Sequence, residues 1–168
     1  MVPEMAIFHL GVLVAAAGLL IFAAISDAQR YLIPNLICLA LLLLFPLYVV
    51  TAPNEVAWAQ HLGVFVLVLA AGFAMFAWNI AGAGDIKLLA VTGLWAGPHL
   101  VALFLFVTAI TGGLLALIVA GITYRRNLVR GAKNAVALAR VPIPYGVAIA
   151  IGGLCTLVML SHPVLFSA

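Results

Sequence analysis

Two aspartates at the ends of separate apolar stretches are the residues of this sequence best suited to do chemistry. Asp85 stands between Gly84 and Lys87 at the start of one apolar stretch, and Asp27 stands at the end of another. The chain has 168 residues and only four acidic ones. Two carboxylates that share a water molecule act as base and acid, because like charges a few ångströms apart cannot both ionise. The pair predicts hydrolysis by activated water, with no metal, cofactor or covalent nucleophile.

The neighbours of Asp85 fit such a site. Gly82 and Gly84 let the backbone approach a substrate where a Cβ would interfere. Asp85 would face the positive end of a helix macrodipole. Lys87 either tunes and orients the pair or is a lysine that reaches the membrane interface, and both interpretations stay open. A simpler alternative makes Asp85 a helix N-cap and Asp27 a loop residue at the interface.

The composition places these residues in a membrane protein. Hydrophobic residues make up 68% of the chain and charged residues 7%, where soluble domains have roughly a quarter charged. We therefore expect an all-α, polytopic membrane protein with one domain over residues 1–168. Stretches long enough to cross a bilayer predict six helices, at about residues 6–26, 35–51, 59–80, 86–97, 98–123 and 143–162. Gly97-Pro98 predicts a break after the short fourth helix, although the turn could instead lie near 111–113.

The placement of charge predicts the orientation. Arg30, Lys87 and five cations in the polar loop 124–142 follow the first, third and fifth predicted helices, whereas Glu4 and Glu55 lie at the opposite ends. By the positive-inside rule the basic loops and both aspartates are cytoplasmic, and both termini are outside. The basic loop is too short to indicate nucleic-acid binding. Four histidines are predicted at the outer ends, away from the aspartates: His9, His61, His99 and His162.

The motifs around both aspartates resemble those of the type IV prepilin peptidases, which are membrane aspartyl proteases of the GxGD type. The family pattern GxGDxKLxAxxGxxxG is matched at every fixed position, by Gly82, Gly84, Asp85, Lys87, Leu88, Ala90, Gly93 and Gly97. Around the first aspartate the family has a basic residue and Ile-Pro-Asn, matched here by Arg30 and Ile33-Pro34-Asn35. Ile143-Pro144-Tyr145-Gly146 is similar to a third family segment. The matches run in the family's order across residues 27 to 146.

The resemblance implies that Asp27 and Asp85 are the catalytic pair, and it gives supporting roles to Gly82, Gly84, Lys87, Pro34, Asn35, Pro144, Tyr145 and Gly146. It implies that the protein cuts the basic leader from pilin precursors just before their membrane-embedded apolar helix. The site would face the cytoplasm at the bacterial inner membrane. The chain has no room for the cysteine-bearing insertion that long members use with S-adenosylmethionine to methylate the product. It therefore resembles the short form of Tad/Flp pilus systems, and the preflagellin peptidases are similar too.

Two functions of other classes remain as alternatives. Intramembrane carboxylates serve as proton relays, so a proton-coupled transporter or channel is one. Both aspartates are predicted at one face, however, which fits poorly with a binding site at the midplane. The other alternative is an inactive scaffold for pilus assembly. The sequence predicts no oligomeric state.

Overall fold

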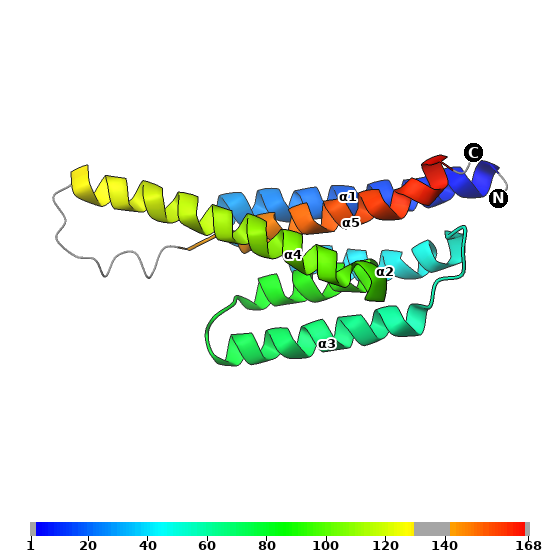
Figure 1. Ribbon diagram of the computed structural model, residues 1–168, viewed down its shortest axis with the longest axis horizontal. Coiled ribbons are helices and arrows are strands. Elements are labelled where there is room, and N and C mark those ends of the chain that lie inside the picture. The colour runs from blue at the N-terminus through cyan, green and yellow to red at the C-terminus, as the bar shows by residue number, and fades with distance from the viewer. Residues whose placement is uncertain (1–2, 130–141, 167–168) are drawn as a thin grey trace.

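The chain folds as a bundle of α-helices that run along one long axis, as seen in the computed structural model, which describes residues 3–129 and 142–166 (Figure 1). Within these ranges the helices are α1 (Pro3–Arg30), α2 (Asn35–Thr51), α3 (Trp58–Ala77), α4 (Ala83–Val129) and α5 (Tyr145–Phe166). By length and composition, three of the described helical segments suit a membrane crossing: Glu4–Arg30, Trp58–Ala77 and Ala83–Arg126. Asn35–Thr51 and Tyr145–Ser161 are apolar but shorter. The predicted all-α membrane fold is confirmed at this level.

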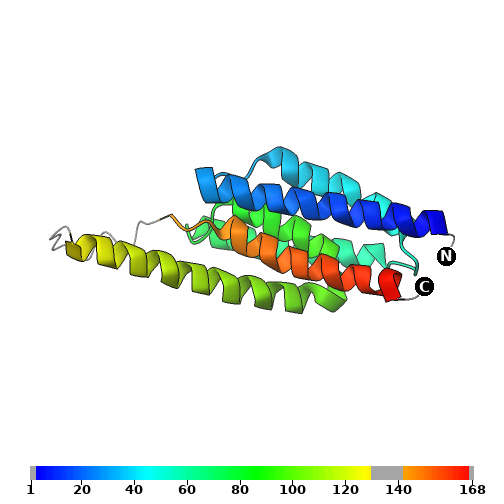
Figure 2. The same cartoon turned by 90° about the horizontal axis from the view of Figure 1, so that it is seen from above.

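Helix α4 turns back on itself at Gly97. Its φ of 60° and ψ of −173° lie in a region that only glycine adopts readily, and Pro98 opens the second half, where its missing N–H costs nothing. The predicted break at Gly97-Pro98 is therefore confirmed, and the alternative turn near 111–113 is wrong, because the helix continues there. Beyond the turn, α4 extends farther than its neighbours (Figures 1 and 2).

Several predicted boundaries need correction. α1 continues through Arg30, so Asp27 lies inside the helix and not in a loop. α4 continues to Val129, so the predicted polar loop 124–142 begins as helix. Residues 130–141 of that loop, with three of its five cations, lie outside the described residues. α3 ends early, at Ala77, and Asn79 then takes a positive φ of 57°, which asparagine tolerates better than most residues.

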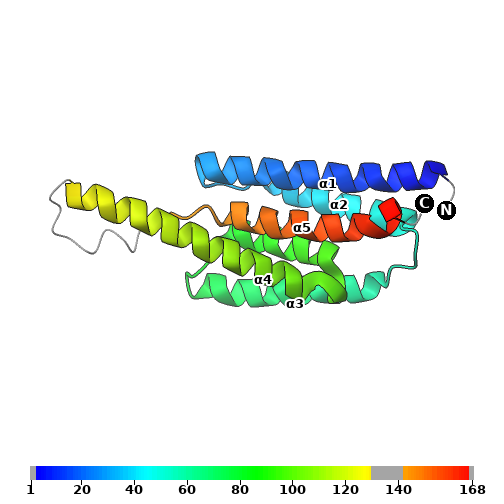
Figure 3. The ribbon, with the colours of Figure 1, turned by 45° about the horizontal axis from the view of Figure 1, so that its top comes forward.

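Helix α1 packs against α5 and α2, and α4 packs against α2, α3 and α5 (Figure 3). α1 presents small residues, including the fully buried Ala16 and Ala23, which allow close approach of helices. An aromatic cluster fills the end opposite the aspartates: Trp95 lies 5.9 Å from Phe45 and 5.3 Å from Tyr48 between ring centroids. This packing holds the first half of α4 against α2.

Substituting phenylalanine for Trp95 is expected to lower the free energy of unfolding by about 2 kcal/mol. The indole Nε1–H donates to the Leu41 carbonyl at 3.1 Å, and the ring is only 2% exposed, so the change removes a buried bond and leaves a void. Unfolding in mixed detergent micelles measures the loss. Trp58→Phe is the matched control because Trp58 is 60% exposed. Equal shifts in both variants would contradict the prediction.

Candidate active site

A cavity of about 710 Å³ lies at the end of the bundle where α1 ends and where α2, α4 and α5 begin. Asp27 and Asp85 both line it, although they are far apart in the sequence. Five of the eight expected supporting residues also line the cavity: Gly82, Gly84, Lys87, Asn35 and Tyr145. The structure thus brings together residues from four helices at one end.

Asp27 is held rigidly in the last turns of α1. Its side chain is only 4% exposed, and its Oδ2 accepts a hydrogen bond of 2.6 Å from the backbone N–H of Gly146 at the start of α5. The position inside a helix rules out the simple loop interpretation for this residue. One carboxylate oxygen is fixed by the backbone of another helix, so the orientation of Asp27 depends on where α5 begins.

Asp85 lies in the first turn of α4, which begins at Ala83. It is therefore not the N-cap residue itself. Its Oδ2 lies against the Gly82 backbone, where an added Cβ would come within 3.0 Å of it. The carboxylate also benefits from the positive end of the helix macrodipole. Asp85 is partly exposed to the cavity, whereas Asp27 is buried.

Ile33 lies between the starts of α4 and α5. A Cβ on Gly84 would lie 3.4 Å from the Cβ of Ile33, and a Cβ on Gly146 would lie 2.9 Å from its Cδ1. The side chain is 7% exposed. Gly84 and Gly146 therefore need to be small because Ile33 fills the space between the starts of α4 and α5.

Lys87 ties the start of α4 to the start of α2. Its Nζ donates to the Asn35 side-chain oxygen at 3.0 Å, so its partner is an amide and not an aspartate. The sequence left two interpretations of Lys87 open, and both depend on its charge. The observed contact is instead a hydrogen bond that joins two helices. Tyr145 makes a similar link, since its ring packs against Gly112 in the second half of α4.

The remaining expected residues lie behind the cavity. Pro34 is the N-cap of α2, and its carbonyl accepts from the Ile37 N–H at 3.0 Å. The carbonyl of Pro144 accepts from the Val147 N–H at 3.2 Å. Gly146 contacts Asp27 directly, as described above. The two prolines thus start helices, and they do not line the cavity.

The sequence did not single out Ser26 and Ile33 as site residues. The Ser26 hydroxyl donates to the Leu32 carbonyl at 2.7 Å and so closes the turn in which Tyr31 has a φ of 52°. A polar residue directly before Asp27 in an apolar helix was the available signal for Ser26. Ile33 was visible as part of the Ile-Pro-Asn match, but its spacing role needs the three-dimensional contact.

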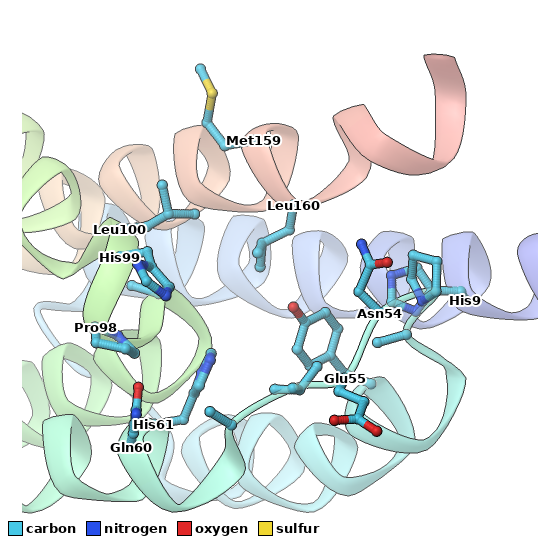
Figure 4. Close-up of a pocket in the computed structure, with 16 residues that line it drawn as sticks. His9, Asn54, Glu55, Gln60, His61, Pro98, His99, Leu100, Met159 and Leu160 are labelled. Atoms are coloured by element: carbon cyan, nitrogen blue, oxygen red, sulfur yellow. The ribbon is translucent and has the colours of Figure 1, made fainter. Parts of the chain in front are cut away.

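A second cavity, of about 250 Å³, lies at the opposite end of the bundle (Figure 4). His9, His61 and His99 line it, as expected from their predicted outer position, whereas the His162 side chain lies outside what the structure describes. His9 Nδ1 is 3.0 Å from the Thr51 hydroxyl, and His61 Nδ1 donates to the Leu94 carbonyl at 2.7 Å. Within the described part of the chain no group of three or more His, Cys, Asp or Glu residues is placed to hold a metal ion.

Comparison with known proteins identifies the family of this chain. No curated protein and no solved structure matches the chain. A family model described as the type IV leader peptidase family matches residues 14–117. That range includes both aspartates and the glycine-rich run, and it covers well over half of the chain, while Gly146 lies beyond it. The family implies aspartic peptidase activity in general. The chain therefore belongs to the type IV leader peptidase family.

Proposed function

We propose that this protein is the leader peptidase of a Tad/Flp-type pilus system, an aspartyl endopeptidase that cuts pilin precursors at the cytoplasmic face of the bacterial inner membrane. The observation that carries the proposal is that Asp27 and Asp85, which the family motifs single out, line one cavity. Membership of the leader peptidase family supports the reaction class.

In the proposed reaction one aspartate is ionised and the other is protonated. The ionised carboxylate takes a proton from water, whose oxygen attacks the carbonyl carbon of the scissile peptide bond. The protonated aspartate donates its proton to the carbonyl oxygen. The tetrahedral intermediate then collapses and the C–N bond breaks. One of its hydroxyl groups returns a proton to the second aspartate, and the leaving nitrogen takes the proton that the first carboxylate received. The hydrogen bond from the Gly146 N–H keeps the Asp27 carboxyl group oriented throughout the reaction.

The proposed topology has six crossings, with α4 contributing two and the aspartates on the cytoplasmic side. Arg30 and Arg126 lie in the last turns of α1 and α4, at the ends of these helices nearer the aspartates, whereas Glu4 lies in the first turn of α1. This distribution agrees with the positive-inside rule. The first half of α4, residues 83–96, rises about 21 Å, against about 30 Å of hydrocarbon. If Gly97 lies at the outer interface, Asp85 lies inside the bilayer, short of its inner interface. A peptide bond near the inner membrane surface would then be within its reach.

The proposed substrate is a precursor with a short basic leader followed by an apolar helix. The leader would stay in the cytoplasm, on the side of the membrane where the aspartates lie. We expect the new N-terminus to stay unmethylated, since only residues 31–34 connect α1 to α2 and this link leaves no space for a methyltransferase module.

The test is a cleavage assay with the purified protein in liposomes. Three precursors are compared: a Flp-type pilin, a pilin of the long-form systems and a preflagellin. We expect the Flp-type precursor to be cut directly before its apolar helix, and mass spectrometry with added S-adenosylmethionine to show no added methyl group.

Each outcome has a separate meaning. Cleavage of only the preflagellin would overturn the Tad/Flp assignment and keep the peptidase. A methylated product would overturn the short-form assignment. Cleavage of none of the three, with a folded protein, would overturn the proposed function, and proton flux across the liposomes that depends on Asp27 would favour a transporter in its place.

A further inference from the structure

An apolar groove of about 400 Å³ lies beside the aspartate cavity, between α2, α3 and the first half of α4. Large hydrophobic side chains line it from both flanking helices. They are Leu39 and Leu42 on α2, and Phe65, Leu69, Phe73 and Phe76 on α3. On α3 these residues recur every three or four positions, so they form one stripe along the helix.

Helices α2 and α3 both pack against α4, and they meet each other at the end away from the aspartates, where the ring centroids of Phe45 and His61 lie 5.5 Å apart. α3 approaches α4 closely at Gly72, where an added Cβ would overlap the side chain of Ile86. α2 is held to α4 by the Trp95 bond to Leu41 and by the Lys87 bond to Asn35. Helices α2 and α3 are thus both fixed to α4, which forms the base of the groove, and the groove is the space left between them.

The groove adjoins the aspartate cavity. Asn35, Ala83 and Lys87 line both. From this junction the groove follows the helices away from the aspartates, over residues 35–42 of α2 and 65–76 of α3. At 1.5 Å per residue these segments rise about 10 Å and 16 Å, which is two to three turns of an adjoining helix.

We propose that this groove holds the apolar helix of the precursor while the peptide bond before that helix lies in the aspartate cavity. The proposal rests on the proposed function, which requires a substrate whose cleavage site directly precedes an apolar helix. A long groove with an apolar lining suits an α-helix laid into it. Because the groove adjoins the cavity at Asn35, Ala83 and Lys87, the start of that helix would lie at this junction, next to the two carboxylates.

Photo-cross-linking tests the groove with two matched positions. Phe73 lines the groove and is 61% exposed, and Phe106 lies outside it, on the second half of α4, and is 63% exposed. A photoreactive phenylalanine analogue replaces one or the other, in a chain that also carries Asp85→Asn so that the precursor stays intact. The proteins are reconstituted with the Flp-type precursor and irradiated. We expect adducts to the precursor's apolar helix from position 73, at least about tenfold more than from position 106.

The result separates this inference from the proposed function. Equal yields at both positions, or adducts from position 73 to lipid only, would overturn the groove even if the wild-type protein cuts the precursor. Adducts from position 73 without any cleavage by the wild-type protein would keep the groove as a helix-binding site and overturn the peptidase. Peptide mapping that puts the adducts in the leader would also contradict the proposed direction.

Discussion

We expect Asp27→Asn and Asp85→Asn each to lower the rate of leader cleavage by at least about 10³-fold. Asparagine has nearly the same shape as aspartate, but it can neither accept a proton from water nor donate one to a carbonyl oxygen, and such proton transfers contribute roughly 10²–10⁴-fold each. The side-chain oxygen of asparagine at position 27 can still accept the Gly146 N–H, so α1 and α5 stay docked. Single-turnover release of the leader, followed by mass spectrometry, measures the effect.

The chain supplies its own controls for this experiment. Its two other acidic residues are Glu4 and Glu55, and Glu55 lines the cavity at the opposite end of the bundle. Glu4→Gln and Glu55→Gln make the same chemical change away from the aspartates, and both should cut at the wild-type rate. Unchanged elution and melting of all four variants would show that the fold survives. A substantial rate in either aspartate variant would exclude that residue from the proposed pair.

The sequence predicted the features that depend on local signals. The break at Gly97 could be read from Gly-Pro, because proline cannot continue the hydrogen bonding of the preceding turn. Asp85 could be assigned to a helix start because an apolar stretch follows a glycine-rich run. The predicted juxtaposition with Asp27 came from the topology and the family motifs, and the cavity contains both residues.

Local signals do not predict features that depend on contacts between distant segments, or helices that continue beyond the end of their apolar stretch. Hydropathy marks where apolar residues stop, near residue 26, but Asp27 and Arg30 continue α1, because the backbone hydrogen bonds of a helix do not require apolar side chains. The bond from Gly146 to Asp27 joins residues 119 positions apart, and no local pattern reveals it. The groove between α2 and α3 is a property of how both pack on α4.

Gly146→Ala is expected to lower the catalytic rate by about tenfold to a hundredfold while leaving the protein folded. Gly146 has no positive φ, so its backbone conformation does not require glycine. The requirement is space: an added Cβ would lie 2.8 Å from Asp27 Oδ2 and 2.9 Å from Ile33 Cδ1. The carboxylate would have to move by a few tenths of an ångström, and displacements of about 1 Å can cost roughly 10²-fold in rate.

The protein should stay folded although its activity falls. Alanine favours a helix over glycine by about 1 kcal/mol, so α5 itself is not weakened. The residues that line the apolar groove come from α2, α3 and α4 and not from α5, so we expect kcat to fall while KM for the precursor stays within about twofold. Gly113→Ala is the matched control, since its added Cβ would have no neighbour within 4 Å. If Gly146→Ala melted early and lost activity only in proportion to unfolded protein, Gly146 would be a structural residue and not one that positions Asp27.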